Sequence, residues 1–130
     1  MPLVRITIRT GKSALYRKAL LDGVHEALRD AFRIPDQDRH QMLVELDEDH
    51  FEIPPHRSGN MVVVEITAFK GRSNEAKKHL YRTIIDNFAK NPGIAGDDVL
   101  IVVHEPPLEN WGIRGGKPAN EVQLGFKVEV

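Results

Sequence analysis

The sequence predicts an α/β (α+β) fold in which a β-α-β unit occurs twice, giving a four-stranded mixed sheet with two helices on one face. Two observations predict it. The chain matches itself without gaps at an offset of 60 residues, and each copy holds a β-rich run, a helical apolar pattern and a second β-rich run. A length of 130 residues is typical of one domain. We expect a single domain at 1–130, with two β-α-β halves at about 2–46 and 61–105 and a tail at 106–130.

The internal match indicates a duplication. About ten identities occur over about 44 aligned positions, several times the frequency expected of unrelated sequences. The alternative is that two unrelated segments share the composition of a β-α-β unit. The identities include Val4 with Val64, Ile6 with Ile66, Gly11 with Gly71, Ser13 with Ser73, Asp38 with Asp98 and Glu45 with Glu105.

Four strands are expected, two in each half. The runs at 3–9 and 61–69 are rich in β-branched residues and partly alternate, so each opens its half as a strand. The apolar runs at 41–46 and 99–103 supply the second strands. Two strands joined by a helix of roughly 20 residues form a parallel pair with a right-handed crossover.

A helix is expected between the two strands of each half. Ser13 and Ser73 stand at positions typical of helix N-caps. Apolar residues then recur at helical spacing as far as Pro35 in the first half and Pro92 in the second, where proline marks the exit.

The remaining segments are a connection and a tail. Residues 47–60 are rich in acid, proline and histidine and predict an exposed connection. Residues 106–118 form a Gly/Pro segment with the only tryptophan, Trp111, and the alternating residues 122–130 predict a closing strand. Because two helices cover only one face of such a sheet, we expect the other face to be covered by oligomerisation.

Composition excludes several classes of protein. The net charge of −1 gives no broadly basic surface for nucleic acid, and the absence of cysteine excludes disulfides and Cys-ligated metals. No apolar run approaches the length of a membrane span, and the N-terminus alternates and carries charge, unlike a signal peptide. We therefore expect a soluble cytoplasmic protein that binds neither nucleic acid nor membrane.

Familiar cofactor and metal-binding motifs are absent from the sequence or incomplete. Residues 11–13 resemble the end of a phosphate-binding loop, but Ile6 stands where its first glycine belongs. The six histidines include no HExxH pair, and neither a nucleophile elbow nor a glycine-rich dinucleotide turn occurs. We interpret His25 as a half-buried structural residue, and we expect no metal at His50 and His56, and no cofactor.

Three stretches and a proline carry a resemblance to a known family. Pro2 follows the initiator methionine and opens a strand. Residues 71–77 resemble the Gly-Arg-Ser-Asp-Glu-Gln-Lys helix start of 4-oxalocrotonate tautomerase, and 111–116 resemble its Phe-Gly-Ile-Gly-Gly segment. Residues 34–41 resemble the Pro-x-x-Asp-Arg-Tyr-Gln pattern of malonate semialdehyde decarboxylase. The chain thus resembles the tautomerase superfamily over roughly residues 2–118.

The resemblance implies where a site would form. In that fold the first strands of the two halves are antiparallel, so Pro2 would lie beside the end of the third strand, near Lys70 and Arg72. Asp38 precedes the second strand and would lie at the same edge. The opposite edge would be an inactive copy without a free amine, since it holds mid-chain Val62 together with Asp98, Thr10 and Lys12.

The resemblance also implies a mechanism and a trimer. Removal of Met1 would make Pro2 a secondary amine, whose protonated form is disfavoured by burial and by nearby cations. Pro2 would act as general base or acid and Asp38 would activate water or tune the proline, while Lys70, Arg72 and Trp111 would bind the substrate. The expected substrate is a small carboxylate-bearing oxo acid, for keto–enol tautomerisation or for decarboxylation or hydration of the malonate semialdehyde type.

Alternatives remain open at the level of the sequence. Asp38 could cap a turn, Arg72 could be a solvated first-turn arginine, and Trp111 could be a core or interface residue. Leu100 aligns with a second substrate-binding arginine of 4-oxalocrotonate tautomerase, which favours a smaller oxo acid than a diacid. The whole chain could instead be a ferredoxin-like ligand-binding module or an inactive trimeric scaffold.

Overall fold

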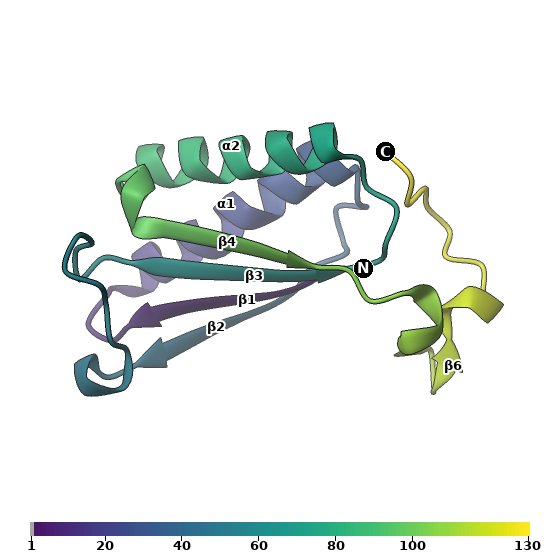
Figure 1. Cartoon of the computed structure of the whole chain (residues 1–130), viewed down its shortest axis with the longest axis horizontal. Coiled ribbons are helices and arrows are strands. Elements are labelled where there is room, and N and C mark those ends of the chain that lie inside the picture. The colour runs from purple at the N-terminus through teal and green to yellow at the C-terminus, as the bar shows by residue number, and fades with distance from the viewer. Residues whose placement is uncertain (1) are drawn as a thin grey trace.

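The computed structural model describes residues 2–130, so the expected removal of Met1 concerns a residue outside the described part (Figure 1). The element order repeats a strand, a helix and a strand. The main elements are β1 (Pro2–Arg9), α1 (Ala14–Phe32), β2 (His40–Leu46), β3 (Val62–Ala68), α2 (Asn74–Lys90) and β4 (Val99–His104).

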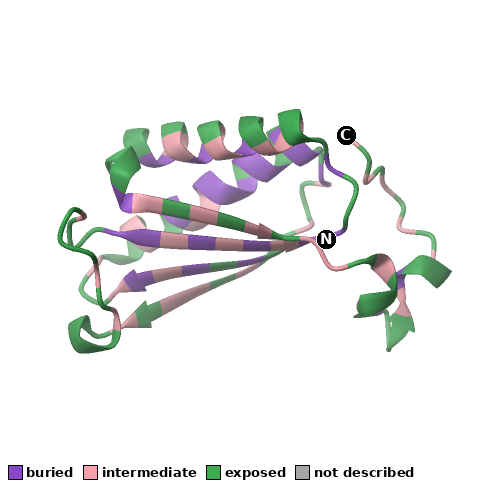
Figure 2. Cartoon of the chain, in the orientation of Figure 1, coloured by how far each residue is buried: buried purple, intermediate pink, exposed green. Residues whose placement is uncertain are grey.

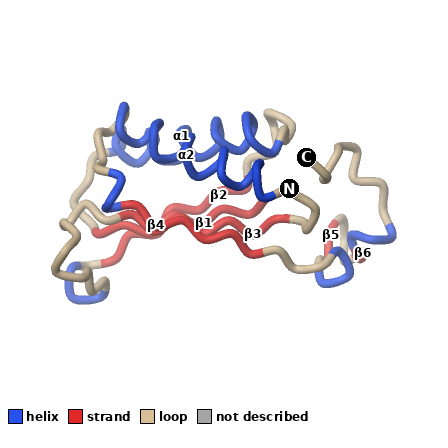
Figure 3. Tube along the Cα trace, turned by 45° about the horizontal axis from the view of Figure 1, so that its top comes forward, coloured by secondary structure: helices blue, strands red, loops and turns tan. Residues whose placement is uncertain are grey.

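The sheet has the order β2-β1-β3-β4. Within each half the two strands are parallel, and β1 and β3 pair antiparallel at the centre, which is the pseudo-twofold relation implied by the family resemblance. Both helices lie on the same side of the sheet (Figure 3). The predicted mixed sheet with two helices on one face is confirmed.

This strand order excludes the ferredoxin-like alternative. In that fold each β-α-β unit is split, with another strand between its two parallel strands. Here β1 pairs directly with β2, and β3 pairs directly with β4.

Local contacts repeat at the same offset as the sequence. The hydroxyls of Ser13 and Ser73 accept backbone N–H bonds from Tyr16 and Ala76, each at 3.1 Å, which confirms both predicted N-caps. An ion pair repeats as well: Arg17 lies 3.7 Å from Glu45, and Lys77 lies 2.5 Å from Glu105. Each pair ties the first turns of a helix to the strand that follows it.

The core lies between the sheet and the helices (Figure 2). Alternate residues of the two central strands point into it and are at most 2% exposed, namely Val4, Ile6, Ile8, Val62, Val64 and Ile66. The opposite face of the sheet is open in the single chain. Large apolar side chains remain exposed on that face, among them Leu3 at 40%, Met42 at 42% and Leu100 at 42%.

The tail corrects one prediction. Residues 122–130, here called the C-terminal segment, form no strand; beyond β4 the described strands are the two-residue β5 (Gly112–Ile113) and β6 (Lys117–Pro118). The segment bends at Val122, Gly125 and Phe126, and Gly125 has φ of 82°, so it does not run as a regular strand. The alternation instead serves packing, since Val122, Leu124, Phe126 and Val128 contact the apolar cluster around Phe69.

The C-terminal segment folds back onto the start of α2. The N–H of Ser73 donates to the carbonyl oxygen of Val130 at 3.0 Å. Gly71, with φ of 141°, has little room for a side chain, because a Cβ there would lie 3.0 Å from Val128. No described helix is long and apolar enough to cross a bilayer.

Candidate active site

The strand register gathers three chain segments at one edge of the sheet. Pro2 pairs with Ala68 in the antiparallel ladder, so the start of β1 lies beside the end of β3. Leu3 pairs with His40, so the start of β2 lies at the same edge. Pro2 is buried there, at the first position of its strand, where a missing N–H is tolerated. The segments carrying Asp38 and Arg72 therefore flank this proline.

Arg72 is the most unusual side chain at this edge. It is only 5% exposed, and its guanidinium lies 4.9 Å above the ring of Phe32. Nη1 donates to the carbonyl oxygen of Phe69 at 2.9 Å, whereas buried Nε and Nη2 have no hydrogen-bond partner among residues 2–130. Burial lowers the pKa of Arg72, and the carboxylates of Glu105 and Asp38 oppose that shift. Arg72 is therefore not the solvated arginine of the alternative interpretation.

Two unpaired buried donors are costly. Each unsatisfied polar group costs about 1–3 kcal/mol, more when it is charged. Nε and Nη2 lie on one side of the guanidinium fork, the arrangement that binds a carboxylate with two parallel hydrogen bonds. The side chain also sits just before α2, whose N-terminus favours an anion. Arg72 thus has the donors of an anion-binding group.

A pocket of about 270 Å³ lies at the same edge, next to the loop between α1 and β2. Asp38 is the only carboxylate in its lining and is half-buried; its backbone N–H donates to the carbonyl of Pro35 at 3.0 Å. That bond fixes the turn before β2 and leaves the Asp38 side chain at the pocket. The lining consists of Pro35, Gln37, Asp38, Phe69, Ile113, Arg114, Leu124 and Phe126.

An aromatic cluster forms one wall of the pocket. The ring of Phe69 packs edge-on against Trp111, with centroids 4.8 Å apart, and stacks on Phe126 at 6.2 Å. The indole N–H of Trp111 donates to the carbonyl of Pro106 at 3.2 Å. Trp111 thus packs against Phe69 but is not itself in the pocket lining.

The sequence-predicted residues are therefore placed unequally. Asp38 lines the pocket, Pro2 and Arg72 are buried at the same edge, and Lys70 is exposed at the end of the strand. Contact of Lys70 and Trp111 with substrate stays a prediction.

Sequence reasoning did not assign seven of the pocket residues to the site: Pro35, Gln37, Phe69, Ile113, Arg114, Leu124 and Phe126. In the sequence, Phe69 ends a β-rich run and Leu124 and Phe126 alternate with polar residues, so all three resemble ordinary core residues of a strand. The available signal was Arg114, an arginine within the glycine-rich stretch 111–116, where the resembling segment has only glycine after its isoleucine.

The opposite edge is filled by its own connection. Asp98, 8% exposed, accepts hydrogen bonds from the backbone N–H and the hydroxyl of Ser58, at 2.8 and 2.5 Å. The Ser58 bonds hold the pKa of Asp98 below its ordinary value. Lys12, the counterpart of Arg72, donates to the side chain of Asn60. Ser58 and Asn60 thus hydrogen-bond the polar side chains Asp98 and Lys12 of the opposite edge, so we assign this edge a structural role.

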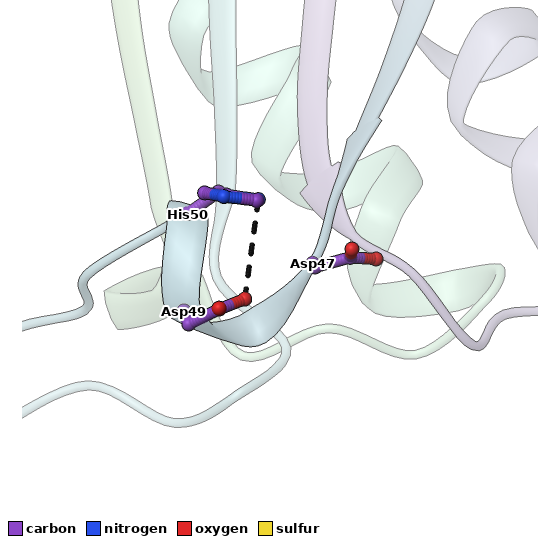
Figure 4. A group of neighbouring side chains, drawn as sticks. All are labelled: Asp47, Asp49 and His50. Atoms are coloured by element: carbon purple, nitrogen blue, oxygen red, sulfur yellow. Dashed lines mark ion pairs between the residues drawn. The ribbon is translucent and has the colours of Figure 1, made fainter.

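One further cluster lies in the connection between the halves. Asp47, Asp49 and His50 are neighbours at a short 3₁₀ turn, all exposed, with His50 Nδ1 3.9 Å from Asp49 (Figure 4). Asp47 also accepts a long hydrogen bond of 3.5 Å from Thr10. These are ordinary pairs of an exposed acidic loop. His25 is 3% exposed, with Nε2 3.4 Å from Asp36.

Models of known protein families match most of the chain. Two family models, each described as "Tautomerase enzyme", match residues 38–114 and 2–61. A protein of Bacillus subtilis (strain 168) named "Probable tautomerase YrdN" is 32% identical over 122 residues, covering 90% of this chain and 94% of the relative. The "2-hydroxymuconate tautomerase" of Comamonas testosteroni is 33% identical over 55 residues, covering 42% of this chain and 87% of that protein.

Solved structures agree. A malonate semialdehyde decarboxylase structure has a TM-score of 0.81 and 26% identity, covering 89% of this chain and 93% of the other. A second decarboxylase, inhibited by 3-bromopropiolate, has a TM-score of 0.82 and 28% identity, covering 94% and 98%. A native fused 4-OT, at 19% identity over 95% of this chain and 99% of the other, shares the fold with a TM-score of 0.83. The family-model matches and the 32% identity to a relative over 90% of this chain show that the chain belongs to the tautomerase superfamily of enzymes.

Proposed function

We propose that this enzyme uses Pro2, freed by removal of Met1, as a general base or acid on a small oxo acid. The reaction is keto–enol tautomerisation, or decarboxylation or hydration of the malonate semialdehyde type. The observation that carries the proposal is Arg72, a nearly fully buried guanidinium with two unpaired N–H donors, at the edge that also holds Pro2 and Asp38.

Arg72 binds the substrate carboxylate in this proposal. Nε and Nη2 donate to its two oxygens, while Nη1 stays bonded to Phe69 and fixes the orientation of the fork. Because Arg72 is buried, the charge-assisted hydrogen bonds are stronger than they would be in water. The bound carboxylate in turn compensates the buried positive charge.

Pro2 moves the proton. As a neutral secondary amine it takes a proton from the carbon next to the carbonyl, and the C–H electron pair becomes the enol or enolate double bond. Returning the proton to a different atom completes a tautomerisation. Protonated, the same nitrogen polarises a carbonyl, so that a carboxylate can leave as carbon dioxide or water can add.

Asp38 is the second catalytic group in the proposal. Its place in the pocket lining suits a carboxylate that accepts a proton from water or stabilises a positive Pro2. Lys70 is exposed and would attract the anionic substrate, and Trp111 would hold Phe69 against it. The chemistry requires no metal and no cofactor.

The two malonate semialdehyde decarboxylase structures support the decarboxylase-like branch. Decarboxylase and hydratase activities are both described for one of these proteins. We therefore propose malonate semialdehyde and phenylenolpyruvate as the first two assay substrates. The exposed apolar face of the sheet, with Leu3, Met42 and Leu100, supports a homotrimer in which these faces meet.

The decisive experiment compares wild type with Pro2→Ala in both assays. We expect a loss of at least about 100-fold in kcat/KM, the usual contribution of a general acid or base. Pro55→Ala, in the exposed connection 47–60, is the matched control and should keep wild-type activity. Equal rates in wild type and Pro2→Ala would refute the mechanism, and no turnover by wild type would favour an inactive scaffold.

A further inference from the structure

The turn between β5 and β6 contains an arginine in an unfavourable backbone conformation. Arg114 has φ of 48°, and the next two residues, Gly115 and Gly116, have φ of 84° and 91°. Positive φ is natural for glycine but strained for a residue with a side chain. Glycine at 114 would relieve that strain, so the arginine points to a role for its side chain.

The Arg114 side chain fastens the C-terminal segment. Nη1 donates to the carbonyl of Gln123 at 2.5 Å and Nη2 to the carbonyl of Leu124 at 3.3 Å. These bonds lie at the near end of the segment, and the bond from Ser73 to Val130 holds its far end. Between the two, the ring of Phe126 stacks on Phe69. Arg114 thus sets where the segment crosses the pocket.

The fastened segment gives the pocket an apolar wall. Leu124 and Phe126 line the pocket together with Phe69 and Ile113, and the loop that carries Asp38 supplies further lining. Nη1 and Nη2 of Arg114 each donate to a backbone carbonyl, whereas Nε and Nη2 of Arg72 have no partner among the described residues. The only carboxylate in the lining, Asp38, would repel a second substrate carboxylate. The pocket therefore suits an uncharged apolar group.

We propose that Arg114 is a positioning residue that holds Leu124 and Phe126 as a specificity wall. The wall selects oxo acids with a single carboxylate and an apolar substituent, such as an aryl group, rather than diacids. The inference rests on the proposed function, because it takes Arg72 as the carboxylate-binding group.

The test uses two probe substrates, phenylenolpyruvate, with one carboxylate and an aryl group, and 2-hydroxymuconate, a diacid. Wild type should ketonise phenylenolpyruvate with a kcat/KM at least about tenfold higher than its kcat/KM for 2-hydroxymuconate. Phe126→Ala should lower kcat/KM for phenylenolpyruvate about tenfold, mainly by raising KM, and change the diacid value by less than about threefold. Lys127→Ala, an exposed neighbour, is the matched control.

Arg114→Gly tests the positioning role separately. Glycine suits the backbone at 114, so the turn should keep its shape while the segment loses its fastening. We expect the same selective rise in KM for phenylenolpyruvate, with partial rescue in Arg114→Lys, since lysine lacks the planar fork that reaches two carbonyls. If Phe126→Ala does not fold, Phe126→Leu and Arg114→Gly provide the same comparison.

The outcomes separate this inference from the proposed function. No turnover of phenylenolpyruvate, 2-hydroxymuconate or malonate semialdehyde by wild type means that the proposed function fails. Turnover of malonate semialdehyde alone overturns the specificity wall while the proposed function stands. Turnover that favours the diacid, or equal losses on both substrates in the folded variants, overturns the specificity wall while the proposed function stands.

Discussion

Ser58 donates two hydrogen bonds to Asp98, the residue that lies 60 positions after Asp38. The two aspartates precede equivalent strands in the two halves; Asp98 is hydrogen-bonded by the connection between the halves, and Asp38 lines a pocket. We assign a structural role to Asp98 and propose a chemical one for Asp38. The structural role can be tested by substituting Asp98.

Asp98→Asn should destabilise the protein without affecting its chemistry. The loss of charge-assisted bonds from Ser58 is expected to lower the free energy of unfolding by about 1–3 kcal/mol at pH 7, measured by urea denaturation. Because the folded pKa of Asp98 is lowered, its contribution is full above the unfolded value near 3.9 and is lost as pH falls through the folded value. The gap between wild type and variant should therefore narrow below about pH 4. Asp97→Asn, at an exposed neighbour, should show no such gap.

Arg72→Met should separate binding from stability. The variant loses the bond to Phe69 but also removes two unpaired buried donors, so we expect the free energy of unfolding to change by no more than about 1 kcal/mol. KM for carboxylate substrates should rise about 10- to 100-fold, and far less for the corresponding esters. Arg82→Met, on the exposed side of α2, is the control. An unchanged KM would remove Arg72 from the site.

The free amine proposed for Pro2 can be removed without changing any side chain. Inserting one alanine between Met1 and Pro2 turns the proline nitrogen into an amide, and we expect activity to fall at least about 100-fold. The same insertion after Gly59, at the opposite edge, should leave activity intact. Intact-mass measurement of the unaltered chain should show that Met1 is absent. A chain that keeps Met1 and is fully active would contradict the mechanism.

The open face of the sheet predicts the oligomeric state. Wild type should be a trimer at micromolar concentration by analytical ultracentrifugation, because exposed apolar residues on one flat face favour burial. Leu100→Lys should shift the protein towards monomer. Leu15→Lys, at a residue on α1 that is 79% exposed, should remain a trimer. A monomeric wild type would refute the assembly.

Most of the fold could be predicted because local signals agree with one another. The serine caps, the helical spacing and the β-rich runs recur at one offset, so each half supports the interpretation of the other. Strand pairing then follows from topology and brings Pro2 beside Ala68.

The apolar wall could not be predicted in the same way. Leu124 and Phe126 alternate like strand residues, but whether such a segment joins a ladder depends on a free edge that sequence alone does not reveal. Phe69 and Phe126 lie 57 positions apart, and only the bend of the tail around Arg114 brings their rings together. The burial of Arg72 likewise depends on Phe32, which comes from the other half.

The two ends of the described chain lie toward the same end of the molecule, since Pro2 pairs with Ala68 at the end of β3 and Val130 accepts a hydrogen bond from Ser73 at the start of α2 (Figure 1). This arrangement decides how the protein should be handled in the laboratory. A tag fused after Val130 would extend the segment that carries Leu124 and Phe126 of the pocket lining, and one before Pro2 would block the amine that the proposed mechanism requires. The exposed connection at 47–60, on the far side of the sheet, is the better place for a label, a fluorophore or an immobilisation site.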